Sequence, residues 1–408
     1  MTIKRLFLPG LMLMFIFLLI NSCTQSERRK QEKIRQISQD PSIGAGKNVL
    51  TEFQTPGVQD NLPVFYTKLA DRLTFPLSWL SGKYNDFEKW KTTARAKVME
   101  SLIYSPPPVP FQPIFIDEQD RGDYIAQKVV INITADSRIL SYLLRPKGEG
   151  PFPAVLLLHD HGARFDIGKE KVIKPFGVKP EISESAQQWV TECYGGRYIG
   201  DELAKAGYVC LCMDALNWSD RGGAKYEGQQ SLASNLFNLG ASLAGVIAYE
   251  DLRAAEFLAT LPNIDTTKVA AMGLSMGSYR TWQVAALSHH IKAGVAICWM
   301  ATAKGLMIPG NNHTRGNSAF TMTHPGLFNY LDYPDIASIA CPKPMLFFNG
   351  LQDNLFPVPS VEEAYEKMHK VWESQGAGSR LLTKLWDDKH VYSIAMQDEA
   401  FAWLKKNL

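Results

Sequence analysis

The chain contains two kinds of apolar pattern, which together predict alternating strands and helices. Several short runs are apolar at nearly every position, as is typical of parallel strands buried on both faces of a sheet. These runs occupy residues 153–158, 208–213, 268–272 and 344–348, and a further strand is expected at 380–386. Helical stretches follow at residues 278–286, about 360–374 and about 393–408. We therefore expect an α/β fold with a mostly parallel, doubly wound sheet.

The part of the chain before these strands has a different pattern. Residues 125–133 and 139–144 alternate between apolar and polar positions, which predicts antiparallel strands at one edge of the sheet. Residues 65–123 carry helical patterns, and we assign them to an N-terminal extension that packs on the core. Residues 124–408 have a suitable length for one α/β domain.

The first residues have the composition of a targeting segment. Lys4 and Arg5 precede an apolar stretch of about fifteen residues, which is short for a membrane-spanning helix. Cys23 follows in a setting that resembles a bacterial lipobox, so we expect residues 1–22 to be a lipoprotein signal peptide and Cys23 to be lipidated. Residues 23–64 are polar and are interpreted as a tether. The expected location is the bacterial cell envelope, at the outer membrane and facing the periplasm or the surface; an uncleaved membrane anchor is the alternative.

Charge argues against one class of partner. The full chain carries 43 basic and 41 acidic residues. Removal of residues 1–22 takes away Lys4 and Arg5 and no acidic residue, so the remaining chain is close to neutral. Nucleic acid is therefore not an expected partner, whereas a membrane, through the lipid at Cys23, is.

The pattern of cysteines favours buried core residues over a disulfide framework. Beyond Cys23 there are five, so at least one is unpaired. Cys210 and Cys212 lie on one face of an expected strand and Cys298 lies in another, which is typical of small core residues.

A Gly-x-Ser-x-Gly motif at residues 273–277 carries the strongest chemical signal. It follows the strand at 268–272 and precedes the helix at 278–286, which is the arrangement of the nucleophile elbow of α/β-hydrolases. Glycine at 273 and 277 removes side chains that would collide with the neighbouring elements of so sharp a turn. We predict that Ser275 is a nucleophile and that the N–H of Met276 is one donor of an oxyanion hole.

Two further strands end in residues that complete a catalytic triad. Asp353 follows the strand at 344–348, and His390 follows the strand at 380–386. The order serine, acid, histidine is that of α/β-hydrolases. We predict that His390 is the general base and that Asp353 orients it. Asp332 and Asp335 remain alternative acids, whereas Asp387 and Asp388 are expected to be solvated.

The second oxyanion donor is expected after the strand at 153–158. The sequence there is His159-Asp160-His161-Gly162, which has the position of the glycine-rich loop of esterases without its spelling. We favour the backbone N–H of His161, with Gly162 allowing close approach. A His-x-His pair also suggests a metal site, but the sequence offers no further ligands at a suitable spacing, so no metal is predicted.

Two long insertions, at residues 163–200 and 301–340, are expected to form walls or a lid over this site. Four residues in loops near the predicted strand ends are candidates for substrate contact, although ordinary packing is at least as good an explanation for each: Arg164, Trp218, Arg221 and Trp299. His313 and His324, in the second insertion, are further candidates. His289, His290 and His369 are expected to lie on the surface.

Several separated motifs resemble one family. They occupy residues 151–162, 165–171, 273–277, 330–335 and 350–353. Together they resemble a bacterial branch of the α/β-hydrolase superfamily that is similar to dienelactone hydrolases and acetyl xylan esterases, over about residues 65–408. The resemblance implies a secreted carboxylesterase linked to polysaccharide breakdown. Ser275 differs from the cysteine of true dienelactone hydrolases, and Met276 differs from the arginine of glucuronoyl esterases.

The sequence therefore predicts a serine carbohydrate esterase that needs no cofactor and removes acetyl groups from plant-type polysaccharides or oligosaccharides through an acyl-enzyme. A uronate or pectin methylesterase, or an enzyme like the glucuronoyl esterases, is the alternative, and it would require a cation such as Arg221 or Arg280 at the site. A peptidase of the prolyl-oligopeptidase type shares this kind of catalytic domain. It is disfavoured because such peptidases also carry a β-propeller, and the sequence shows no pattern for one. The alternative from another class is an inactive glycan-binding lipoprotein.

Overall fold

The computed structural model describes residues 57–223 and 225–408, together with residues 28, 29 and 32. The predicted signal segment, Cys23 and most of the predicted tether lie outside the described residues. The chain divides into a unit at residues 1–59, in which β1 is Val58–Gln59, and a compact unit at residues 60–408. The fold below is that of the second unit.

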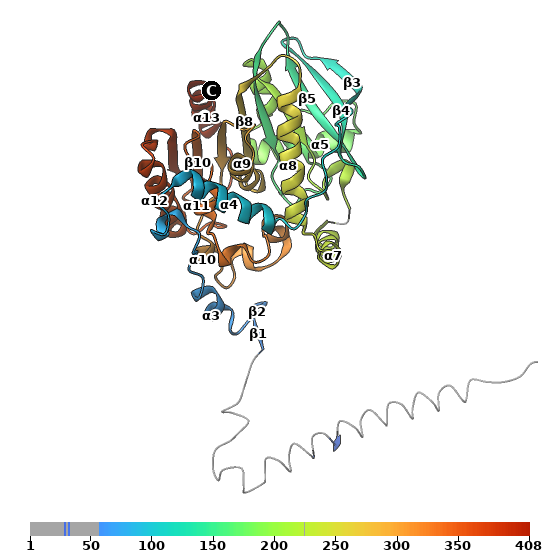
Figure 1. Ribbon diagram of the computed structural model, residues 1–408. Coiled ribbons are helices and arrows are strands. Elements are labelled where there is room, and N and C mark those ends of the chain that lie inside the picture. Colours follow the sequence, from blue (N-terminus) through green and yellow to red (C-terminus); the bar gives the residue numbers. More distant parts are fainter. Residues whose placement is uncertain (1–27, 30–31, 33–56, 224) are drawn as a thin grey trace, which may run out of the picture. The chain divides into compact units, whose positions relative to one another are not determined.

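A nine-stranded sheet forms the centre of this unit, in the order β11-β10-β9-β8-β6-β7-β5-β4-β3 (Figure 1). The strands of the parallel part are β6 (Phe152–Leu158), β7 (Val209–Met213), β8 (Ile264–Leu274), β9 (Ala293–Ile297), β10 (Met345–Gly350) and β11 (Leu381–Trp386). The antiparallel edge consists of β3 (Ile114–Asp120), β4 (Tyr124–Thr134) and β5 (Ser137–Pro146). A two-residue strand, β2, lies at Leu62–Pro63. The predicted α/β-hydrolase fold is confirmed.

Helices cover both faces of the sheet. Those whose buried residues pack in one core cluster are α4 (Phe87–Ser101), α8 (Leu243–Thr260), α9 (Met276–Leu287), α11 (Tyr333–Ser338) and α12 (Val358–Ser374). Those in the second cluster are α5 (Pro180–Tyr194), α6 (Ile199–Lys205) and α13 (Ile394–Asn407). Successive residues of β6 alternate between the clusters, with Leu156 in the first and Val155 and Leu157 in the second. This alternation explains why the strand is apolar at every position.

The remaining helices are short or lie at the margin of the core. The α-helices are α3 (Tyr66–Asp71), α7 (Lys225–Asn238) and α10 (Ala303–Leu306). The 3₁₀ helices are η1 (Trp79–Ser81), η2 (Lys169–Lys171), η3 (Ser219–Arg221), η4 (Asn312–Thr314), η5 (Asn317–Thr321), η6 (Leu327–Asn329) and η7 (Gly378–Arg380). Among the described helices, none is long and apolar enough by itself to cross a membrane, although α7 and α8, bent by 88°, pass that test as a pair.

The N-terminal extension packs on the sheet domain through α4. Asp86 caps this helix by accepting a hydrogen bond from the N–H of Lys89, and Trp90 is fully buried. The guanidinium of Arg95 donates to the carbonyl of Ala286 at the end of α9 (3.1 Å). The extension is not only helical, because β3 lies within it and pairs with β4. Every residue of β3 is exposed, so no burial pattern marked it as a strand.

Candidate active site

Ser275 lies at a strained turn between β8 and α9. Its φ of 57° and ψ of −123° are rare for a residue with a side chain, and strain of this kind is common at functional positions. Its N–H donates to the carbonyl of Ile297 at the end of β9 (2.8 Å). A Cβ at Gly273 would meet the carbonyl oxygen of Leu158 at 2.5 Å, and one at Gly277 would meet the same oxygen at still closer range. The turn therefore requires both glycines.

Asp353 and His390 are joined by a short hydrogen bond. The Nδ1 of His390 lies 2.6 Å from Oδ2 of Asp353, whose side chain is fully buried. The other oxygen of Asp353 accepts from the N–H of Leu355 (2.9 Å). Because an ionised carboxylate only accepts, Nδ1 carries the proton and Nε2 is left as an acceptor. The loops after β10 and β11 are themselves tied together, since the N–H of Gln352 donates to the carbonyl of Asp388 (2.9 Å).

One further side chain approaches this pair. The Sγ of Cys298, with ligand atoms of Asp353 and His390, forms a group within 4.8 Å of the kind that can hold a metal ion. The thiol, however, lies 3.5 Å from the carbonyl of Val391, to which it can donate. Burial raises its pKa well above the ordinary value, which disfavours the thiolate that metals prefer. The arrangement fits an aspartate–histidine pair with a packed thiol behind it.

The loop after β6 presents backbone atoms to the same site. The ring of His161 accepts from the N–H of Ala163 at Nδ1 (3.2 Å), so Nε2 carries the proton and donates to Gln229 (2.9 Å). Burial lowers the pKa of His161 to about 4, so the ring is neutral. Gly162 has a φ of +56°, and a Cβ there would meet both Asp160 Oδ1 and Trp189 at 2.5 Å. Met276 is the first residue of α9, so its N–H has no acceptor within the helix.

Residues from each of these segments line one cavity of about 270 Å³, among them Ser275, His390, His161 and Gly162. Its apolar wall consists of Trp299, Leu306, Met322, Leu355 and Phe356. Its remaining lining residues are Ala163, Trp189, Tyr226, Asn311, Asn312, His313 and Ser318. Among the described residues that line it, there is no lysine, arginine, aspartate or glutamate.

Comparison with known proteins identifies the family of this chain. Residues 77–373 match the abhydrolase family. The chain belongs to this family. A Bacillus subtilis (strain 168) protein, provisionally named the hydrolase YtaP, is 26% identical over 289 residues, which is 71% of this chain and 90% of that protein.

Solved structures resemble this abhydrolase in fold. A protein from Bacteroides fragilis NCTC 9343, provisionally assigned as an acetyl xylan esterase, superimposes with a TM-score of 0.62 at 17% identity, covering 78% of this chain and 80% of that one. A glucuronoyl esterase from Solibacter usitatus gives a TM-score of 0.58 at 14% identity (81% and 96% covered). The methylesterase BT1017 gives 0.56 at 16% identity (83% and 68% covered). At these identities the likeness shows the shared fold.

Of the four predicted substrate contacts, only Trp299 lines the cavity of this abhydrolase. Trp218 is fully buried and donates its indole N–H to the carbonyl of His161 (3.1 Å). Arg221 forms two 2.6 Å hydrogen bonds with Glu250. Arg164 lies over the ring of Trp189, 6.0 Å from its centroid, and is not among the lining residues. Trp218 and Arg221 are corrected to structural residues, since packing and an ion pair already engage them.

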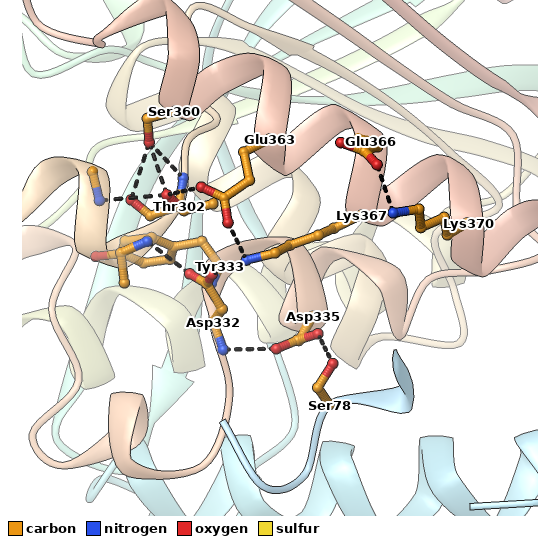
Figure 2. Close-up of polar contacts among 12 residues, drawn as sticks. Ser78, Thr302, Asp332, Tyr333, Asp335, Ser360, Glu363, Glu366, Lys367 and Lys370 are labelled. Carbon is orange, nitrogen blue, oxygen red and sulfur yellow. Dashed lines mark hydrogen bonds and ion pairs between the residues drawn. The ribbon is translucent and has the colours of Figure 1, made fainter. Parts of the chain in front are cut away.

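Asp332 and Asp335, the alternative acids, are engaged elsewhere, and the carboxylate bonded to His390 is that of Asp353. They form a capping box at the start of α11, in which Asp335 accepts from the N–H of Asp332 (2.9 Å) (Figure 2). Asp335 also accepts from the hydroxyl of Ser78 in the extension (2.5 Å). Asp332 accepts from the N–H of Ala303, at the start of α10 (2.7 Å), and its other oxygen lies 3.2 Å from Lys367. These acids connect the start of α11 to three other segments, namely the N-terminal extension, α10 and α12.

The other histidines have ordinary environments, with one exception. His324 is buried against Gln283, 2.5 Å from its amide nitrogen, and does not line the cavity. His369 contacts Thr383 through Nε2 (2.9 Å), and the rings of His289 and His290 lie 3.9 Å apart. The exception is His313, which lines the cavity and whose Nε2 lies 3.1 Å from the hydroxyl of Tyr333.

Sequence reasoning missed most of the cavity wall. Leu306, Asn311, Asn312 and Met322 all come from the insertion at 301–340, and Trp189 comes from the insertion at 163–200. The only signal for them was the length of the two insertions. That signal identifies a wall and does not single out its residues.

Proposed function

We propose that this abhydrolase is a serine carboxylesterase that acts through an acyl-enzyme. The observation that carries the proposal is the 2.6 Å bond between Asp353 and His390, with His390 sharing one cavity with the strained Ser275. In the first step Ser275 Oγ attacks the ester carbonyl while Nε2 of His390 takes its proton. Backbone N–H groups of Met276 and His161 receive the developing oxyanion. His390 then protonates the leaving alcohol and activates the water that releases the acid.

The cavity favours a neutral ester on a carbohydrate. Its apolar wall suits the hydrocarbon part of an acyl group, and Trp189 and Tyr226 offer partly exposed aromatic faces for a sugar ring. A uronate would bring a carboxyl group, and the described lining holds no lysine or arginine to receive it. The two cations suggested for a uronate are both engaged elsewhere, Arg221 with Glu250 (2.6 Å) and the buried Arg280 with Asp251 (2.6 Å). We therefore propose removal of acetyl groups from polysaccharides or oligosaccharides ahead of uronate methylesters.

The location is a separate proposal that rests on sequence. Residues 1–22 and Cys23 have the composition of a lipoprotein leader, and we propose that the protein is anchored in the cell envelope through a lipid at Cys23. Metabolic labelling with an alkyne fatty acid is expected to label the intact protein and not its Cys23→Ala variant. Equal labelling of both forms would reject the anchor.

Turnover of an ester panel tests the activity. The panel contains p-nitrophenyl acetate, acetylated xylan and methyl-esterified pectin, with acetate and methanol measured for the protein and for Ser275→Ala. Acetate release that is lost in Ser275→Ala supports a deacetylating serine esterase, whereas methanol release alone moves the proposal to uronate methylesters. An inactive glycan-binding protein would bind xylan without turnover, and covalent labelling of Ser275 by a fluorophosphonate would exclude it.

A further inference from the structure

A fully buried lysine lies directly beneath the loop that follows β6. Lys171 is the last residue of η2, and its ammonium donates to the carbonyls of Asp160 (2.9 Å) and His161 (2.8 Å). The carboxylate of Asp160 lies 3.6 Å away and supplies the counter-charge. Burial lowers the pKa of Lys171, and the nearby Asp160 opposes this shift. A buried charge is costly, so its presence at this point asks for an explanation.

The two carbonyls determine where two N–H groups point. In a trans peptide the C=O and the N–H of the next residue point in opposite directions. The direction of the Asp160 carbonyl therefore sets the direction of the His161 N–H. In the same way, the direction of the His161 carbonyl sets that of the Gly162 N–H. Lys171 holds both carbonyls on the core side of the loop. Both N–H groups consequently point away from the core, on the side where His161 and Gly162 line the cavity.

Neither of these N–H groups is used elsewhere. Within the part of the chain that the structure describes, the N–H groups of His161 and Gly162 have no acceptor in the protein. The next N–H, that of Ala163, donates to the ring of His161 instead (3.2 Å). A pair of aligned donors without partners beside a nucleophile is the arrangement that stabilises an oxyanion.

Other side chains hold the same carbonyls. The indole N–H of Trp218 donates to the carbonyl of His161 (3.1 Å). The ring of His159 accepts from the N–H of Ala215 at Nε2 (3.0 Å), so its Nδ1 carries the proton and donates to the carbonyl of Asp160 (2.9 Å). Each carbonyl thus accepts from Lys171 and from one aromatic side chain. Among the residues that the structure describes, Lys171 alone donates to both carbonyls.

We propose that Lys171 is a positioning residue that aims the N–H groups of His161 and Gly162 at the oxyanion. The charge also polarises the two peptide groups, which increases the positive character of their N–H ends. This inference rests on the proposed esterase function and adds a second donor, Gly162, to the His161 donor expected there. It also assigns a role to the motif at residues 165–171, which the triad leaves unexplained.

The experiment compares Lys171→Met with Lys343→Met. Lys343 is a matched control because its ammonium also donates to two backbone carbonyls, those of Ala285 and Ser288 (2.6 and 2.8 Å), away from the cavity. The readouts are kcat and KM for p-nitrophenyl acetate and the inhibition constant of butylboronic acid, which becomes a tetrahedral anion on the serine. We expect Lys171→Met to lower kcat about 10- to 100-fold, to change KM less than about threefold, and to weaken the boronate by a similar factor.

The control and a second variant make the outcome decisive. Lys343→Met is expected to keep kcat within about threefold, and an equal loss in both variants would overturn the proposal. So would a folded Lys171→Met variant with unchanged kcat, or a loss confined to KM. If Lys171→Met does not fold, the decision passes to Lys171→Gln, which removes the charge and the long reach of the ammonium but keeps a polar N–H donor inside the core. Its kcat is expected to fall about 3- to 10-fold, and an unchanged kcat overturns the proposal.

Failure of the proposed function has a different signature. In that case the unmodified protein itself shows no ester turnover and no covalent labelling of Ser275 by a fluorophosphonate. If the unmodified protein hydrolyses esters but the lysine variants do not differ as expected, the esterase function is supported and the positioning role of Lys171 is rejected.

Discussion

The two halves of the cavity are held in place by different kinds of contact. The chemical half, with Ser275 and His390, lies at the ends of hydrogen-bonded strands, and backbone hydrogen bonds tie its loops together. Much of the other half comes from the insertion at 301–340, in which side-chain contacts join the short helices to one another and to the loop after β10. In that insertion, Asn311 donates to the carbonyl of Leu355 (3.3 Å) and Asn312 donates to Ser318 (2.9 Å). The difference implies that substitutions in the first half abolish turnover, whereas substitutions in the second alter selectivity.

The largest expected effect is in the chemical half. Asp353→Asn is expected to lower kcat about 10⁴-fold, because the amide no longer fixes the tautomer of His390 or stabilises its charged form. Steady-state kinetics with p-nitrophenyl acetate measure it. Asp387→Asn is the control, because the Asp387 carboxylate accepts from the exposed side-chain amide of Gln352 (2.9 Å) and so kcat should stay within about threefold. Comparable losses in the two variants would contradict the assignment of the acid.

A smaller loss of kcat is expected from a substitution at Gly162, in the loop after β6 that lines the cavity. Gly162→Ala places a Cβ against Asp160 and Trp189 and is expected to lower kcat roughly 10- to 100-fold by displacing the loop. Gly196→Ala is the matched control, because Gly196 also has a positive φ (82°) but has no atom within 4 Å of the added Cβ. That variant should lose about 1 kcal/mol of stability, measured by urea unfolding, and retain kcat. If Gly162→Ala retains full activity, the loop does not supply a donor.

The wall should respond through selectivity. Leu306→Ala enlarges the apolar side and is expected to raise the ratio of butyrate to acetate turnover about 10-fold, while acetate turnover changes less. The substitution also removes a buried side chain and should cost about 2–5 kcal/mol of stability. Leu239→Ala, at a position that is 82% exposed, serves as the control for both measurements. An unchanged ratio in a folded Leu306→Ala variant would show that this wall does not contact the acyl group.

The smallest effect on turnover is expected from the acids that support the wall, because their contribution is to stability and its dependence on pH. Burial raises the pKa of Asp335 to about 7, with the neighbouring Asp332 adding to the shift. Because the folded-state pKa lies above the ordinary value of 3.8, this group stabilises the fold at low pH, and that contribution is lost as pH rises from about 4 to about 7. Asp335→Asn should reduce this loss by an amount on the order of 1–4 kcal/mol. Urea unfolding between pH 4.5 and 8 measures it, and identical pH slopes for the two proteins would reject it.

The parts that the sequence could predict are those with a local signature. The strand runs, the elbow at Ser275 and the positions of Asp353 and His390 after successive strands all follow from patterns within short segments. The roles of Trp218 and Arg221 could not be read in this way, because their partners, the His161 carbonyl and Glu250, lie 57 and 29 residues away. β3 was missed because every residue of this edge strand is exposed, so no buried face imposes an alternation of apolar and polar positions on its sequence. The wall was missed because its residues come from segments that are separated in the sequence and meet only in the folded chain.

The order of the site residues along the chain also determines when, during synthesis, the protein can begin to hydrolyse esters. Ser275, Asp353 and His390 follow β8, β10 and β11, which are made in that order, and β11 pairs with β10 alone at the edge of the sheet. A nascent chain therefore has its nucleophile long before it has a base to activate it. Under the proposed mechanism, an unfinished or truncated chain that ends before β11 is inert towards esters, so the enzyme cannot act until its last strand has docked.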